Sequence, residues 1–172
     1  INKIKVTGLS KNNNLELEEK MNNFFYKNIL IFGKKEINMI MSEYNIIEEY
    51  YAKKIYPSEI KIEIKPTKFI AKISNNNQFI VGSNGKLIKS EETNDKLPYI
   101  FGKFNSKKFL NFKKNIERSK FNFTDFKSIS FYPSNRLDIL TTKGILIKLP
   151  ENNLLKSLNL GYEIIKNDQL QG

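Results

Sequence analysis

Cysteine and histidine are both absent from this chain of 172 residues. Their absence excludes thiol nucleophiles, disulfide bonds, zinc sites of the usual Cys/His type and imidazole acid–base chemistry. Long apolar runs are also missing, since the longest one contains only four residues, 29–32. A membrane-spanning helix needs about 20 apolar residues, so no segment of this sequence is predicted to cross a bilayer.

Arginine is scarce although the chain is strongly basic. The formal net charge is +11, yet only Arg118 and Arg136 are arginines among 29 basic residues. A basic chain suggests nucleic-acid binding, but arginine is the side chain best suited to bidentate phosphate and base contacts. The 27 Lys, 23 Asn and 24 Ile instead fit a bias toward A/T-rich codons. A basic nucleic-acid-binding domain remains an alternative, and no specific nucleic acid is expected as a partner.

The residues that are present predict a folded chain of one or two domains. Apolar residues make up 40% and aromatic residues 12% of the sequence, which is enough for a packed core. In the first 65 residues, Ile4 and Val6 alternate with lysines, as in a half-buried strand. Asn13 and Glu16 resemble a capping box at the start of a helix.

Two amphipathic helices and two further strands follow. Apolar residues recur with helical spacing in two groups: Leu17, Met21, Phe24 and Phe25, then Ile37, Ile40, Met41 and Tyr44. Residues 47–55 read as a strand, and Ile60, Ile62 and Ile64 alternate with charged residues in another. Two helices cover only one face of a three-stranded sheet, so the other face is left to solvent or a partner.

The pattern becomes rich in strands after Pro66. Strands are predicted at residues 69–73, 78–81, 86–88, 129–132, 136–141 and 145–149, with a hairpin turn at Asn84 and Gly85. Residues 106–119 predict a helix whose inward face carries Phe109, Phe112 and Ile116. A closing helix is indicated by Leu154, Leu155, Leu158, Tyr162 and Ile165, although Gly161 weakens it.

Five motifs in order resemble the FtsQ/DivIB family of cell-division proteins. They are IKVTGL at residues 4–9, Tyr56-Pro57-Ser58-Glu59 before an alternating strand, IVGSNGKLI at 80–88, Leu97-Pro98 with Gly102, and RLDILTTKGILIKLP at 136–150. The resemblance implies an α+β protein. Residues 1–67 would form a POTRA domain with β-α-α-β-β order, a three-stranded sheet and both helices on one face. Residues 68–172 would form a β-rich domain with a mixed or antiparallel sheet and flanking helices, lacking a last strand expected after Gly172.

The family resemblance also implies a function. The segment would be the periplasmic or extracytoplasmic part of a single-pass protein of the bacterial inner membrane, anchored through a segment absent from this chain. It would act without cofactor at the division site, as a scaffold for FtsB/FtsL-like coiled-coil proteins and other divisome members. The first alternative is a POTRA-type module of an outer-membrane assembly or secretion system.

An enzyme is the least favoured class. Glu48 and Glu49 are adjacent, and adjacent side chains on a strand point to opposite faces, so this pair cannot act together.

Partner binding is expected in the second domain, where residues 103–148 hold 11 basic against three acidic residues. The candidate residues are Arg136, Leu140, Ile145, Ile147, Leu149, Leu154, Leu158, Tyr162 and Ile165. Arg136 could clamp an acidic partner bidentately, or it could pair with Asp138 on the same strand face. A second recruitment strand is expected to carry Glu49, Ala52 and Lys54.

Overall fold

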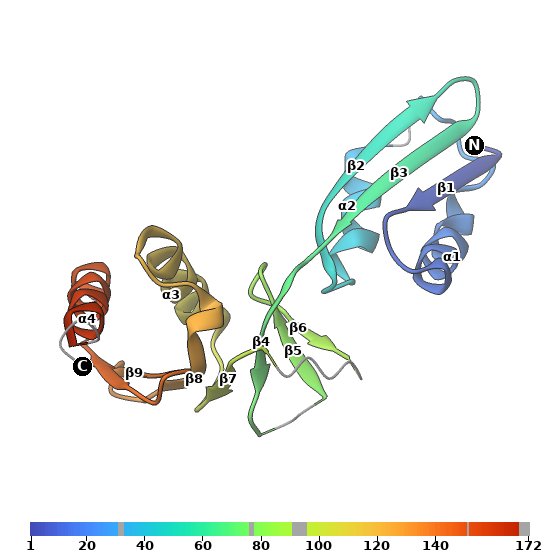
Figure 1. Ribbon diagram of the computed structural model, residues 1–172. Helices are drawn as coiled ribbons and strands as arrows, with labels where there is room; N and C mark the ends of the chain where they lie inside the picture. The colour runs from blue at the N-terminus through green and yellow to red at the C-terminus, as the bar shows by residue number, and fades with distance from the viewer. Residues whose placement is uncertain (31–32, 76–77, 91–95, 151, 169–172) are drawn as a thin grey trace. The chain divides into compact units, whose positions relative to one another are not determined.

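The computed structural model describes residues 1–30, 33–75, 78–90, 96–150 and 152–168, and the chain divides into two compact units, Ile1–Lys68 and Phe69–Gly172 (Figure 1). In the first unit the order strand, helix, helix, strand, strand is confirmed. Its elements are β1 (Lys3–Thr7), α1 (Lys11–Lys20), the 3-10 helix η1 (Met21–Phe24), α2 (Lys34–Ser42), β2 (Ile47–Ile55) and β3 (Glu59–Pro66).

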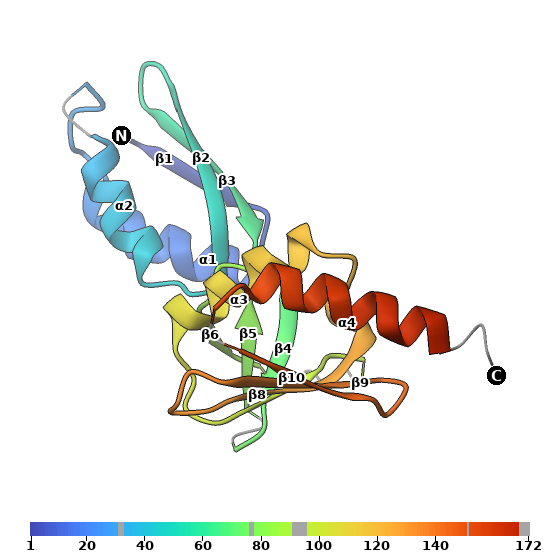
Figure 2. The ribbon, with the colours of Figure 1, turned by 90° about the vertical axis from the view of Figure 1, so that its left-hand side faces the viewer.

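The first unit is a three-stranded sheet with α1 and α2 on one face (Figures 1 and 2). Strand β3 is central, parallel to β1 and antiparallel to β2. The alternation predicted for β3 is confirmed, because Ile60, Ile62 and Ile64 are all buried in one core with Leu17 and Ile37. Burial of these branched side chains is the main favourable contribution to this unit's stability.

The predicted helix start at Asn13 is wrong. The N-cap is Ser10, whose hydroxyl accepts a hydrogen bond from the backbone N–H of Asn13 at 3.3 Å. Serine is a preferred N-cap because its short side chain satisfies an otherwise unpaired N–H of the first turn. The α-helix ends at Lys20, and Met21 begins η1, so the apolar stripe expected on one helix is divided between two elements.

Within its described residues, the second unit holds a seven-stranded sheet and two α-helices. Its elements are β4 (Phe69–Ile73), β5 (Phe79–Gly82), β6 (Leu87–Lys89), β7 (Tyr99–Phe101), α3 (Ser106–Arg118), the 3-10 helix η2 (Phe123–Asp125), β8 (Phe126–Phe131), β9 (Leu137–Thr141), β10 (Leu146–Leu149) and α4 (Leu154–Asp168). The strand order is β10-β9-β8-β7-β4-β5-β6. Strand β7 is parallel to both β4 and β8, and the other pairs are antiparallel.

Both helices of this unit lie on one face of the sheet (Figure 1). Helix α4 lies over β10, whereas α3 packs through Phe109 on β4, β5 and β7 and through Phe112 and Ile116 on β8 and β9. The inward face predicted for α3 is confirmed, since Phe109, Phe112 and Ile116 are almost fully buried. Phe112 packs edge-on against Phe123 and Phe131, at centroid distances of 5.9 and 6.0 Å. Aromatic side chains therefore fill much of the space between helix and sheet.

Strand β8 begins at Phe126, three residues before its predicted start at Ile129. A bulge between Phe126 and Ser128 interrupts the period-2 pattern in its pairing with β9. A bulge adds one residue to one strand, so apolar residues on either side of it no longer alternate. The sequence pattern therefore indicated only the later part of the strand.

Candidate partner-docking site

Strand β10 forms one edge of the seven-stranded sheet, and within the described residues it has a neighbour on one side only. Thr141 donates a backbone hydrogen bond to the carbonyl of Ile145 at 2.9 Å. Hydrogen-bonded and non-hydrogen-bonded pairs alternate along an antiparallel ladder. By this alternation Leu146 and Lys148, which face Leu140 and Asp138 of β9, direct their backbone N–H and C=O groups to the open edge.

Helix α4 places apolar side chains beside this edge. Gly161 lies over β10, because a Cβ added there would be 3.5 Å from Cγ2 of Ile147. Ile164 follows Gly161 by three residues and so lies on the same side of the helix, and Leu160 is one turn before Ile164. Leu160 and Ile164 are 60% and 53% exposed. A chain that paired with β10 would therefore meet apolar surface from the helix as well as main-chain hydrogen-bonding groups.

The residues predicted from sequence for partner binding divide by burial. Leu149 and Leu158 are 1% and 0% exposed and belong to the core, so they have no surface to offer a partner. Ile147, Leu154, Tyr162 and Ile165 are partly buried against that core. Leu140 is half-buried, and Ile145 is exposed.

Arg136 is paired within the chain. Its Nε lies 3.1 Å from Oδ1 of Asp138, and its Nη2 donates to Oδ2 at 3.3 Å. Its guanidinium also stacks on the ring of Tyr132, with 4.2 Å between Cζ and the ring centroid. Asp138 is buried, and its Oδ1 has the ion-pair contact without a well-aligned hydrogen bond. The pairing with Asp138 that was one of the two alternatives for Arg136 is thus present in the structure.

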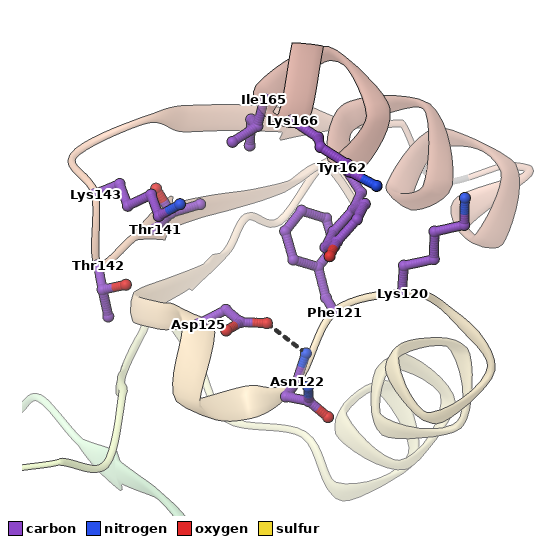
Figure 3. Close-up of a pocket in the computed structure, with 10 residues that line it drawn as sticks. All are labelled: Lys120, Phe121, Asn122, Asp125, Thr141, Thr142, Lys143, Tyr162, Ile165 and Lys166. Carbon is purple, nitrogen blue, oxygen red and sulfur yellow. Dashed lines mark hydrogen bonds between the residues drawn. The ribbon is translucent and has the colours of Figure 1, made fainter. Parts of the chain in front are cut away.

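A pocket of about 280 Å³ adjoins the β9–β10 turn (Figure 3). Lys120, Lys143 and Lys166 surround it on three sides, with the rings of Phe121 and Tyr162 between them. The remaining lining residues are Asn122, Asp125, Thr141, Thr142 and Ile165. Three segments that are distant in sequence therefore meet at this pocket: residues 120–125, the β9–β10 turn and the last turns of α4.

Main-chain and ring contacts fix the walls of this pocket. Thr142 N–H donates to the carbonyl of Asp125 at 2.8 Å, and Lys120 N–H donates to Oδ1 of Asn159 at 3.2 Å. Phe121 and Tyr162 pack edge to face at 5.1 Å between centroids. The pocket is therefore formed before any ligand arrives.

The charges around the pocket are partly compensated. Lys120 pairs with Glu163, and this hydrogen bond, together with the charges of Lys120 and Lys166, lowers the pKa of the Glu163 carboxyl. Asp125 uses its Oδ2 to accept the backbone N–H of Asn122 at 2.7 Å. Lys143 also has a partner within the chain.

Sequence reasoning named Tyr162 and Ile165 but missed the three lysines of the pocket and the flank formed by Leu160 and Ile164. No local pattern joins the three lysines, because they come from three separate segments. Leu160 and Ile164 did carry a signal, since apolar residues four apart and outside the core stripe form a second face on a helix.

The second predicted recruitment strand lies in the first unit. Glu49, Ala52 and Lys54 all line a separate pocket of about 620 Å³ between α2 and β2. Glu49 is paired with Lys65 at 3.1 Å, and Ala52 and Lys54 are half-buried. Strand β2 is an edge of its sheet within the described residues.

The described part of the chain contains no cluster of three or more acidic side chains that could hold a metal ion. Nor does any helix in that part have the length and apolar character needed to cross a membrane.

Comparison with known proteins identifies the family. The family model "Cell division protein FtsQ/DivIB, C-terminal" matches residues 70–171, which is more than half of the chain. The chain therefore belongs to the FtsQ/DivIB family of cell-division proteins, and the resemblance found in its motifs is confirmed.

A solved structure with a similar chain is the major extracytoplasmic domain of the trans isomer of the cell-division protein DivIB from Geobacillus stearothermophilus. The two sequences are 12% identical, and the match covers 55% of this chain and 87% of that chain with a TM-score of 0.41. Among curated proteins no match is found.

Proposed function

We propose that this chain is a non-enzymatic scaffold of the bacterial division machinery. It belongs to a membrane-anchored protein, lies outside the inner membrane, and holds other division proteins, among them FtsB/FtsL-like coiled-coil proteins. Membership of a family of cell-division proteins supports a role in the division machinery. The open edge at β10 of the second sheet supports binding of the partner by strand addition.

The observation that carries this proposal is the open edge of β10 beside the apolar flank of α4. Among the described residues no strand pairs with the outer main-chain groups of Leu146 and Lys148, and Leu160 and Ile164 of α4 are exposed. In strand addition, main-chain hydrogen bonds supply affinity and alternate side chains supply specificity.

The experiment that tests the proposal blocks the edge without breaking the sheet. Proline removes one backbone N–H, and at Lys148 that N–H points away from β9, so Lys148→Pro should leave the β9–β10 ladder intact. We expect the variant to bind the extracytoplasmic segment of an FtsB-like protein about tenfold or more weakly, because at least one main-chain hydrogen bond and its neighbour are lost.

The matched control is Lys89→Pro on β6, at the opposite edge of the same sheet. Gly82 donates to the carbonyl of Lys86, so the same alternation directs the N–H of Lys89 away from β5. Binding should be unchanged in this control. Equal binding by Lys148→Pro and the unaltered chain would place docking elsewhere, and β2 with Glu49, Ala52 and Lys54 would be the next strand to block.

A further inference from the structure

We infer that one end of the first unit binds an anionic phospholipid surface, with Tyr26 and Tyr56 at the level of the lipid headgroups. This end, the tip surface, consists of residues 26–30, residues 1–2, the turn between β2 and β3, and the first turn of α2 (Figure 2). The inference rests on the proposed function, because that function places the chain outside the inner membrane and so beside a lipid surface.

Main-chain hydrogen bonds join the segments of the tip surface. Tyr26 N–H donates to the carbonyl of Ile1 at 2.9 Å, and the nitrogen of Ile1 donates to the carbonyl of Lys27 at 2.8 Å. Asn2 N–H donates at 2.8 Å to the carbonyl of Ser58, which lies in the turn between β2 and β3. Figures 1 and 2 both show these segments at one end of the sheet. A single flat surface can therefore meet all of them at once.

Three large side chains of the tip surface are exposed to solvent. Tyr26 is 92% exposed, Leu30 69% and Tyr56 62%. Tyr26 also has a φ of +65°, which is unfavourable for a bulky residue. Backbone strain of this kind is concentrated at functional sites. At Tyr26 it occurs in a residue whose ring contributes nothing to the core, so a role in binding explains it better than a role in folding.

Lysines accompany these side chains. Residues 21–35 include Lys27, Lys34 and Lys35, all exposed, and no acidic residue. Lys34 and Lys35 form part of the first turn of α2, at the positive end of the helix dipole. Cations at that end destabilise a helix. An anionic ligand therefore accounts for the position of these two lysines, whereas helix stability does not.

The acidic residues near the tip surface do not cancel these charges. Glu59 pairs with Lys3 at 3.3 Å, and Glu36 caps α2 by accepting the N–H of Gly33 at 3.1 Å. Residues 31–32 lie outside the described residues and are uncharged in the sequence. Three lysines thus remain against the single carboxylate of Glu36 in this part of the described chain.

A lipid surface fits this combination better than a folded partner does. The exposed apolar side chains belong to turns, which are convex, whereas the residues that dominate protein interfaces fill pockets. A bilayer is fluid and can admit a convex tip. Tyrosine is enriched at the membrane–water interface, and lysines beside apolar side chains attract anionic headgroups while the apolar groups enter the acyl boundary.

A single tryptophan can report on this contact, because the chain contains none. The probes for Tyr26→Trp are vesicles of phosphatidylglycerol and phosphatidylcholine in equal parts, and vesicles of phosphatidylcholine alone. We expect the emission to move to shorter wavelength with the anionic vesicles, because the indole passes from water into the interfacial region. The neutral vesicles should have much less effect. Tyr51→Trp is the matched control, since Tyr51 is 65% exposed on β2 of the same unit, and its emission should not change.

Two pairs of lysines separate the tip surface from the lysine content of the whole chain. Lys34→Gln with Lys35→Gln removes two charges from the first turn of α2, and Lys107→Gln with Lys108→Gln does the same in the first turn of α3. In co-sedimentation of the 172-residue chain with anionic vesicles, the first pair should weaken binding about tenfold or more, because each lysine near an anionic membrane contributes several-fold. The second pair should leave binding nearly unchanged. Equal weakening by both pairs would overturn the inference.

Tyr26→Asn separates binding from folding. Asparagine adopts positive φ more readily than tyrosine, so the variant removes the ring and keeps the backbone. We expect several-fold weaker binding to anionic vesicles, with a melting temperature that is unchanged or higher. A lower melting temperature together with unchanged vesicle binding would make Tyr26 a structural residue and contradict its place at the lipid.

Three further outcomes separate this inference from the function on which it rests. If anionic vesicles leave the emission of Tyr26→Trp unchanged while the FtsB-like segment still binds in a manner sensitive to Lys148→Pro, the lipid inference fails and the scaffold proposal stands. If the vesicles bind through the tip surface but Lys148→Pro has no effect on that segment, the lipid inference stands and the β10 edge is wrong. An emission shift caused by the FtsB-like segment and not by vesicles would make the tip surface a protein-docking site and overturn the lipid inference.

Discussion

At the scale of single residues, Ile62 is among the most deeply buried side chains of the first unit. It is 0% exposed and lies on the central strand beneath both helices. We expect Ile62→Ala to lower the free energy of unfolding by about 2–5 kcal/mol, because it removes buried methyl groups and leaves a cavity. Urea denaturation measures the change. Ile55→Ala, at a position 38% exposed, should cost about 0.5 kcal/mol or less, and similar losses for both variants would refute the assignment of this core.

We predict that Arg136 stabilises the fold through its ion pair with Asp138. Truncation to Ala leaves the buried Asp138 carboxylate without its cation, which should cost about 1–3 kcal/mol in thermal or urea unfolding. Asp138→Asn in the same chain should recover part of the loss, since an amide is less costly to bury than an unpaired carboxylate. Arg118→Ala, at the exposed end of α3, is the control and should be nearly neutral. If Arg136→Ala leaves the free energy of unfolding unchanged, the pair with Asp138 does not stabilise the fold, and a role of Arg136 in partner binding would be the remaining alternative.

At the scale of elements, alanine substitutions at two glycines with similar φ angles distinguish the cost of backbone strain from the cost of steric overlap. Gly102 follows β7 with φ +90°, and a Cβ there would be 2.1 Å from the carbonyl oxygen of Phe131. Gly144, in the β9–β10 turn, has φ +83° and open space around it. Gly144→Ala should cost about 1–2 kcal/mol from backbone strain alone. Gly102→Ala should cost much more, because β7 and β8 must also separate. Equal shifts in melting temperature would contradict this packing.

Elements with a sustained period were predictable, and junctions between elements were not. The alternation of Ile60, Ile62 and Ile64 identified β3 because burial on one face requires it. The start of α1 was misplaced because Ser10 and Asn13 are both good caps, and only the tertiary contacts of the chain choose between them. Among these, Glu18 of α1 accepts the N–H of Val6 at 2.7 Å. Strand β8 was shortened in the prediction by its bulge.

At the scale of the whole molecule, the sequence predicted the family better than the site. Ordered motifs spread over the chain were sufficient to find the FtsQ/DivIB resemblance, and the family model supports it. The pocket could not be found in this way, because Lys120, Lys143 and Lys166 meet only once the hairpin and α4 have folded. Contacts between residues close in sequence could be predicted, as the pair of Arg136 with Asp138 shows. Contacts between segments that the fold brings together from distant parts of the sequence could not be predicted.

The most direct test of the account is amide hydrogen exchange of this chain with and without the FtsB-like extracytoplasmic segment. Leu146 and Lys148 direct their N–H groups to the open edge, so both should exchange rapidly in the free chain. Addition of a partner strand pairs them, and we predict strong protection at these two residues, with Ile147 between them already protected by β9. Protection confined to β2 of the first unit, or no new protection in β10 when the segment is bound, would contradict docking at this edge.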